Sequence, residues 1–244
     1  MKSSQWNRRD VIKSGLAALA AAGTRPLWAL SPSPAGTVVL FQGDSITDCG
    51  RDRASADPNR AGPLGTGYPL LIASAELAAR PERGLKFFNR GISGNKVPDL
   101  EARWPADTVA LKPDVLSILI GVNDYWHKRN GNYTGTVAEY EAGFRALLEA
   151  TRQALPAVRL VVIEPFVLRC GAVDASWFPE FDERRAAAAR VARGANATFV
   201  AMHDAFTALA SRTSPEYWAA DGVHPTPAGH GLIAERWRRL VRLP

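Results

Sequence analysis

Apolar and polar positions are grouped along this chain in a repeating order. Five short runs rich in Val, Ile, Leu and Phe are typical of strands buried on both faces of a sheet: 37–42, 85–89, 114–120, 159–165 and 197–202. Stretches with the apolar spacing of helices separate and follow them: 67–80, 96–104, 137–154, 180–194, 204–211 and 227–240. This alternation predicts an α/β fold with a parallel sheet covered by helices on both faces.

Polar clusters follow the first three predicted strands. They read Gly43-Asp44-Ser45, "NRGISGN" at 89–95 and "GVNDYWH" at 121–127, and a fourth cluster, "DGVHPTPAGH" at 221–230, precedes the last helix. Right-handed crossovers bring the carboxyl ends of parallel strands to one edge of the sheet, where such folds place their sites. Each cluster alone could be structural, as a turn or as a helix entry capped by Thr226. Their combination favours a functional site.

In this order the four clusters resemble the SGNH hydrolase superfamily, the GDSL-type esterases and lipases. The residues that carry the resemblance are Ser45 in "GDS", Gly94 in "GISGN", Asn123 in "GVND" and His224 in "DGVH". It extends over about residues 37–240. It implies a flavodoxin-like three-layer sandwich around a parallel sheet of about five strands, and a serine ester hydrolase that needs no cofactor.

The chemistry of these residue types agrees with that implication. A serine hydroxyl becomes a good nucleophile when a neighbouring base takes its proton, and His224 is the candidate base for Ser45. Asp221, three residues earlier, could hold the other ring nitrogen. The resemblance assigns the oxyanion hole to the backbone N–H groups of Ser45 and Gly94 and to the side-chain amide of Asn123.

Two other folds fit less well. An α/β-hydrolase has Gly-x-Ser-x-Gly at its nucleophile, whereas Thr47 stands where the second Gly would be. Neither a Walker loop nor a dinucleotide-binding Gly-x-Gly-x-x-Gly follows the first strand.

The substrate is predicted from the loops and from the predicted export of the chain. Aromatic and polar residues next to Asn123, together with Asp44, are expected to contact the substrate: Tyr125, Trp126 and His127. This mixture suits a sugar ester with a small acyl group, foremost acetyl, better than a long alkyl chain. A lipase, lysophospholipase or thioesterase of the same fold remains the alternative. A non-catalytic glycan-binding protein is disfavoured because the motif residues are intact.

The N-terminal residues predict a targeting segment. In "NRRDVIKSGLAALAAAG" (7–23), Arg8 and Arg9 precede an apolar run too short to span a membrane. We therefore expect a twin-arginine export signal at 1–29, a linker at 30–36 and the hydrolase domain at 37–244, in a periplasmic or secreted protein. An ordinary amphipathic helix with a basic start is one alternative. An uncleaved N-terminal anchor is another, because the cleavage site near Ala29 is poorly marked.

Charge and cysteine content limit the remaining possibilities. Residues 1–29 hold five of the 30 basic and one of the 24 acidic residues, so the formal charge falls from +6 to +2 without them. A nucleic-acid partner therefore has little support. Cys49 and Cys170 could form a disulfide after export or remain free thiols, and no Cys or His spacing indicates a metal site.

Overall fold

The computed structural model describes residues 36–243. The predicted signal lies outside these residues, as does the predicted linker up to residue 35. The strands are β1 (Val38–Gly43), β2 (Lys86–Asn89), β3 (Val115–Leu119), β4 (Arg159–Ile163) and β5 (Thr198–Val200). They form one parallel sheet in the order β2-β1-β3-β4-β5. This confirms the predicted parallel sheet of five strands, and the order is that of flavodoxin-like folds.

Ten α-helices are described together with three short 3₁₀ turns. The helices are α2 (Ser45–Asp48), α3 (Ala61–Leu64), α4 (Tyr68–Ala79), α5 (Val97–Asp107), α6 (Val122–Arg129), α7 (Val137–Ala154), α8 (Glu180–Gly194), α9 (His203–Ala210), α10 (Pro215–Trp218) and α11 (Pro227–Leu240). The 3₁₀ turns are Pro81–Arg83, Val109–Leu111 and Ala175–Trp177. None of the helices within 36–243 has the length and apolarity that a membrane crossing requires.

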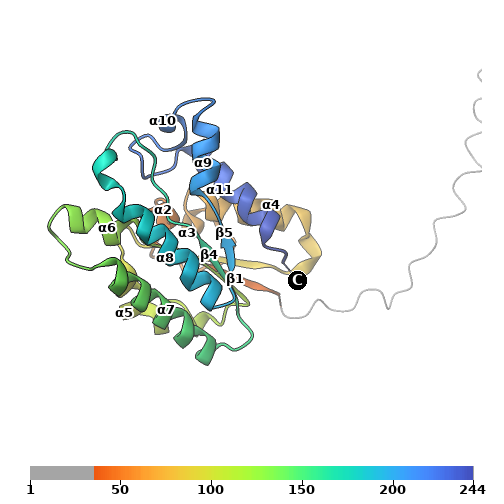
Figure 1. Ribbon diagram of the computed structural model, residues 1–244. Helices are drawn as coiled ribbons and strands as arrows, with labels where there is room; N and C mark the ends of the chain where they lie inside the picture. The colour runs from red at the N-terminus through yellow and green to blue at the C-terminus, as the bar shows by residue number, and fades with distance from the viewer. Residues whose placement is uncertain (1–35, 244) are drawn as a thin grey trace, which may run out of the picture. The chain divides into compact units, whose positions relative to one another are not determined.

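Alternate strand residues face opposite sides of the sheet and build two cores. Val39 and Phe41 belong to a cluster shared with α4, α9 and α11, whereas Leu40 belongs to one shared with α5, α7 and α8. Figure 1 shows α5, α7 and α8 together on one side of the strands, with α4 and α11 on the other. The strands are therefore covered on both faces, which is why they read as continuous apolar runs.

Local sequence signals explain where the longer helices begin. At α7, the Thr136 hydroxyl accepts the Glu139 N–H at 3.2 Å, and the Glu139 carboxylate accepts the Thr136 N–H at 2.8 Å, a capping box. At α11, the Thr226 hydroxyl accepts the Gly229 N–H and Pro227 occupies the first helical position, as the sequence predicts. This cap fixes the segment that carries His224, two residues earlier.

Two segments differ from the sequence reading. Residues 122–129, read as a loop, form helix α6, with Asp124 in its first turn and basic residues in its last turn, a distribution that favours a helix. Residues 61–64, for which the sequence predicted no helix, form helix α3. The first difference matters for function because α6 carries Asn123.

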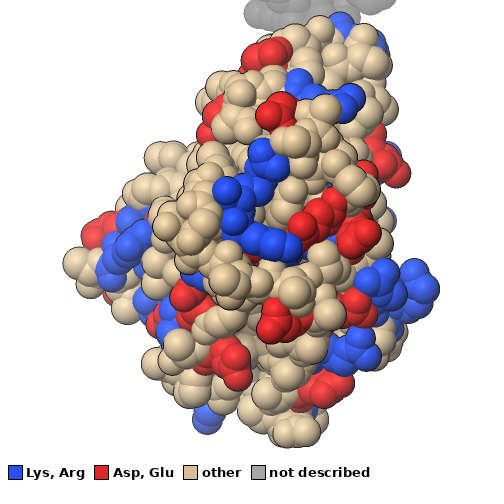
Figure 2. Space-filling view, turned by 60° about the vertical axis from the view of Figure 1, so that its left-hand side comes forward, with Lys and Arg blue, Asp and Glu red and all other residues tan. Residues whose placement is uncertain are grey.

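Charges of both signs are interspersed on the face drawn in Figure 2, where Lys and Arg side chains border Asp and Glu. Among the described residues, many charged side chains form ion pairs, such as Arg190 with Glu141 at 2.6 Å and Lys128 with Glu180 at 2.8 Å. A mixed surface of this kind does not provide the continuous basic face that binds a nucleic-acid backbone.

Candidate active site

Ser45 lies directly beyond the carboxyl end of β1, as the first residue of the four-residue helix α2. Asp44 caps this helix, because its Oδ1 accepts the Ile46 N–H at 3.0 Å. The strand thus ends in a tight turn that presents the serine side chain, while its neighbours Asp44 and Ile46 are buried. The predicted position at the sheet edge is confirmed.

Ser45, His224 and Asp221 form a connected chain of polar contacts. Ser45 Oγ is 2.9 Å from His224 Nε2, and His224 Nδ1 is 2.6 Å from Asp221 Oδ2. The other carboxylate oxygen of Asp221 accepts the backbone N–H groups of Val223 and His224 at 2.9 and 2.7 Å. Residues 179 positions apart in the sequence therefore meet with the geometry of a nucleophile, a base and the group that orients the base.

The carboxyl group of Asp221 is held in its ionised form. Burial alone would raise its pKa, but hydrogen bonds from the His224 side chain and from the backbone N–H groups of His224 and Val223 lower the pKa overall. An ionised Asp221 can accept a hydrogen bond from the N–H group at His224 Nδ1, which leaves Nε2 free to accept the hydroxyl proton of Ser45.

Asn123 occupies the first turn of α6, just beyond β3, and is only 6% exposed. Its Nδ2 donates to the carbonyl of Asn95 at 3.2 Å, which links α6 to the loop that contains Gly94. A primary amide carries two N–H groups, so this bond leaves one available for a substrate oxygen.

Gly94 has φ +83°, a conformation that L side chains rarely adopt. A Cβ at this position would meet only the His127 ring, at 3.9 Å, and would otherwise extend into open space. Within 36–243, the backbone N–H groups of Gly94 and Ser45 donate to no protein acceptor. Both are therefore available to a bound anionic oxygen.

The expected substrate contacts divide into two groups. Asp44 is fully buried and Tyr125 is 5% exposed, with its hydroxyl directed to the Ser176 carbonyl, so the expectation that these two side chains reach a substrate is wrong for this structure. Trp126 is half-buried, with its ring 6.0 Å from that of His224. His127 is half-buried beside Gly94. Trp126 and His127 thus lie where a substrate contact is feasible.

Burial changes the acidity of two carboxyl groups behind the site. It raises the pKa of Asp44 to about 7 and that of Asp124 to about 6. Each group has one oxygen bonded to a backbone N–H, of Ile46 and Val97 respectively, and one buried oxygen without a partner among the described residues. Both carboxyl groups are buried and accept a backbone N–H at the start of a helix, α2 for Asp44 and α5 for Asp124.

The two cysteines are free thiols. Cys49 Sγ is 3.4 Å from both the Thr66 hydroxyl and His230 Nε2, and the Cys170 thiol donates to the Ala219 carbonyl at 3.2 Å. The sequence left open a disulfide or two free thiols, and in the structure the thiols are free. Within the described part of the chain, no group of three or more His, Cys, Asp or Glu side chains is arranged to hold a metal ion.

Sequence reasoning missed Asp48 and its contact with Ser93. Asp48, at the end of α2, accepts hydrogen bonds from both the N–H and the hydroxyl of Ser93, each at 3.0 Å. Ser93 directly precedes Gly94. The only sequence signal was an acid three residues after the candidate nucleophile. Its partner, Ser93, lies 45 positions away and could not be foreseen.

Residues 41–232 match the model of the GDSL-like lipase/acylhydrolase family, so the chain belongs to that family. Together with the Ser45, His224 and Asp221 geometry, this makes it a carboxylic ester hydrolase. It is 36% identical to an acetylxylan esterase of Geobacillus stearothermophilus over 210 residues, which cover 84% of this chain and 94% of the relative.

Solved structures show the same fold. A GDSL-like lipase described as putative, from Parabacteroides merdae ATCC 43184, matches with a TM-score of 0.82 and 45% identity, covering 86% of this chain and 98% of the other. The Geobacillus stearothermophilus acetylxylan esterase matches with a TM-score of 0.77 and 34% identity, covering 88% and 98%.

Mutant structures of that esterase bear on the site. Those described as catalytic mutants replace a serine, a histidine 179 residues further on and an aspartate three residues before the histidine. Ser45, His224 and Asp221 have the same spacing in this chain.

Proposed function

We propose that this protein removes acetyl groups from a carbohydrate ester, with Ser45 as nucleophile, His224 as general base and acid, and Asp221 as the group that orients His224. The observation that carries the proposal is the contact chain of 2.9 and 2.6 Å through His224. The acetylxylan esterase relative supports the substrate class.

In the first half of the reaction, Ser45 Oγ attacks the carbonyl carbon of the ester while His224 Nε2 takes the hydroxyl proton. Asp221 stabilises the imidazolium that forms, since its Oδ2 lies 2.6 Å from Nδ1. When the tetrahedral intermediate collapses, the proton on Nε2 passes to the leaving sugar oxygen. The products of this half are a free hydroxyl on the carbohydrate and an acetyl ester on Ser45.

In the second half, His224 takes a proton from water, and the resulting hydroxide attacks the acetyl carbonyl. Collapse of the second intermediate returns the proton to Ser45 Oγ and releases acetate. Both halves develop negative charge on the carbonyl oxygen. We assign its stabilisation to the N–H groups of Ser45 and Gly94 and the side-chain amide of Asn123, and one such donor typically lowers the barrier by ~3–4 kcal/mol.

The preference for a small acyl group is supported by the surface. Large apolar side chains that are exposed in the described residues are single and scattered: Leu71, Tyr217 and Leu240. An extended chain of methylenes would gain ~0.8 kcal/mol per buried group only where an apolar groove receives it. Beside the site, the accessible groups are instead Trp126 and His127, which suit the flat face and the hydroxyls of a sugar.

A hydrolysis panel tests the proposal. We expect kcat/KM for p-nitrophenyl esters to be highest for acetate or at most butyrate and to fall steeply by octanoate, with release of acetate from acetylated xylan exceeding turnover of pectin and of a lysophospholipid. Ser45→Ala should remain folded and lose at least ~1,000-fold of the activity. A preference for decanoyl or longer chains would favour the lipase alternative, and near-wild-type turnover by Ser45→Ala would remove Ser45 as the nucleophile.

We also propose that the protein is exported to the periplasm or beyond. The support is the sequence alone, with Arg8 and Arg9 before a short apolar run. Export would bring the enzyme to the acetylated polymers of the envelope or the surroundings, which fits the proposed substrate class.

A further inference from the structure

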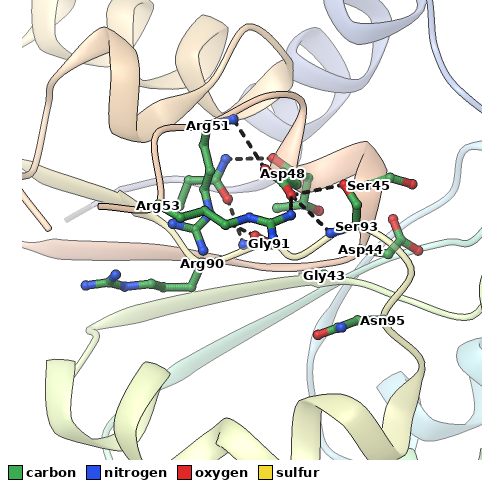
Figure 3. Close-up of polar contacts among 12 residues, drawn as sticks. Gly43, Asp44, Ser45, Asp48, Arg51, Arg53, Arg90, Gly91, Ser93 and Asn95 are labelled. Atoms are coloured by element: carbon green, nitrogen blue, oxygen red, sulfur yellow. Dashed lines mark hydrogen bonds and ion pairs between the residues drawn. The ribbon is translucent and has the colours of Figure 1, made fainter. Parts of the chain in front are cut away.

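Asp48 connects the helix that carries Ser45 with the loop that carries Gly94. It is the last residue of α2 and is 2% exposed. Its Oδ2 accepts the Ser93 N–H and the Ser93 hydroxyl, both at 3.0 Å, and also the guanidinium of Arg53. Its Oδ1 accepts the Arg51 N–H at 3.2 Å. Figure 3 shows Asp48 between Arg51, Arg53 and Ser93, with Ser45 nearby.

The same loop is held against α2 at a second point. Arg51 Nε donates to the Gly91 carbonyl at 2.7 Å. A Cβ at Gly91 would lie 2.4 Å from the backbone nitrogen of Asp48, so the loop and the helix approach as closely as two backbones can. The loop is therefore packed against α2 at Gly91 and hydrogen-bonded to the side chain of Asp48 at Ser93.

We propose that Asp48 is a positioning residue for ester hydrolysis, which sets the Gly94 N–H relative to Ser45 by holding Ser93 against the end of α2. This inference rests on the proposed function, because it presumes that Gly94 and Ser45 act on one substrate carbonyl. Asp48 does not itself reach the substrate. It acts through Ser93, one residue from the donor, and through α2, of which Ser45 is the first residue.

The ionised form of Asp48 suits this role. Burial would raise its pKa, but the hydrogen bonds from Arg53 and Ser93 lower the pKa overall. A carboxylate accepts at both oxygens, and all four of its described contacts are donors. An asparagine has one accepting oxygen and one NH2 group where the carboxylate has two acceptors, so Asp48→Asn turns an N–H group towards one of those donors and removes the charge that Arg53 binds. The substitution therefore weakens the connection with almost no change in volume.

Pre-steady-state hydrolysis of p-nitrophenyl acetate tests the proposal. Negative charge develops on the carbonyl oxygen in both acylation and deacylation, so a displaced Gly94 N–H should slow both steps. For Asp48→Asn we expect both rate constants to fall about 10–100-fold, with KM within about twofold and the burst amplitude unchanged. Ser93→Ala, which removes one of the two bonds from Ser93, should lower both rate constants about two- to tenfold.

The control is Glu141→Gln on α7. Glu141 is also a carboxylate bonded to two arginines, Arg145 and Arg190, but it belongs to the α7–α8 surface. We expect its rate constants to equal those of the wild type whatever its melting temperature. A lower burst amplitude in Asp48→Asn, with both rate constants normal, would mean that fewer molecules are folded and active but that each works normally. Asp48 would then have a merely structural role, and the proposal would be overturned.

The remaining outcomes are also decisive. Wild-type rate constants in Asp48→Asn, or in Ser93→Ala if Asp48→Asn does not fold, would overturn the positioning role. If those variants behave as the wild type while Ser45→Ala is inactive, only this inference fails. If Ser45→Ala itself retains turnover, the proposed function fails first.

Discussion

His230 should make the fold sensitive to acid. It lies on α11, is 5% exposed, and its Nδ1 accepts the Tyr68 N–H at 3.1 Å. Its ring also stacks on that of Tyr68, with centroids 6.3 Å apart, and its Nε2 lies 3.4 Å from Cys49 Sγ. A protonated Nδ1 could not accept the Tyr68 hydrogen bond, so charging this ring would break a contact and bury a cation.

The burial of His230 makes the free energy of unfolding depend on pH. Burial, with a smaller contribution from His224, lowers the pKa of His230 from 6.5 to about 4. The native state therefore keeps the ring neutral between these values while the unfolded chain takes up a proton. Stability from this residue is present above pH 6.5 and is lost as the pH falls towards 4. At pH 5 the loss is about 2 kcal/mol, or about 4–8 °C in melting temperature.

Denaturant unfolding at pH 8 and pH 5 measures this loss. We expect His230→Gln, whose amide oxygen can still accept the Tyr68 N–H, to be less stable than the wild type at pH 8. Between pH 8 and pH 5, however, the variant should lose about 2 kcal/mol less stability than the wild type does.

Tyr68→Phe is the matched control for this measurement. It removes the hydroxyl bonded to Thr47 at 2.8 Å, beside the same ring, and burial raises the pKa of Tyr68 above its usual value of 10, far from the acid range. We expect it to lose the same free energy of unfolding as the wild type between the two pH values. An equal loss in His230→Gln and the wild type would refute the reasoning.

Three further predictions concern the active site and export. Asn123→Ala should lower kcat by ~100-fold or more with a smaller change in KM, measured on p-nitrophenyl acetate, because the amide acts mainly in the transition state; a pure KM effect would make Asn123 a ground-state binder. Asp221→Asn should retain more activity than His224→Ala in the same assay, since a serine and an imidazole 2.9 Å apart can still exchange a proton; equal losses would contradict this. Replacing Arg8 and Arg9 together by Lys should leave the protein in the cytoplasm on cell fractionation, and unimpaired export would point to another route.

The elements that could be predicted are those with strong local signals. Helices 137–154, 180–194 and 227–240 were predicted with the bounds that the structure has, because apolar spacing over several turns defines all three. Capping side chains, Thr136 and Thr226, mark the starts of the first and the last. The strand order, by contrast, came from the family resemblance. Apolar runs show that strands are buried, but not which strands are neighbours.

The sequence motifs predicted the catalytic residues of the candidate site, but not the residues that hold them in place. Serine and histidine have specific chemistry, which marks Ser45 and His224 as candidates. Parallel strands bring the clusters that follow them, including the one with Ser45, to one edge of the sheet. The contact of Asp48 with Ser93 joins residues 45 positions apart and depends on a four-residue helix. Such a short helix has no periodicity to detect, so an acid within it reads as a turn residue.

The aromatic residues after Asn123 show how an error in local structure becomes an error in function. In a loop, Tyr125 and Trp126 could both face the substrate. In helix α6, consecutive side chains point about 100° apart, so Tyr125 is directed into the core against Trp177, with ring centroids 5.4 Å apart, while Trp126 remains half-buried beside His224. Trp177 is itself only 1% exposed and makes edge-to-face contacts with both rings. Under the proposed function, sugar stacking at this edge would therefore depend on Trp126, and removing Tyr125 or Trp177 would act on the position of α6.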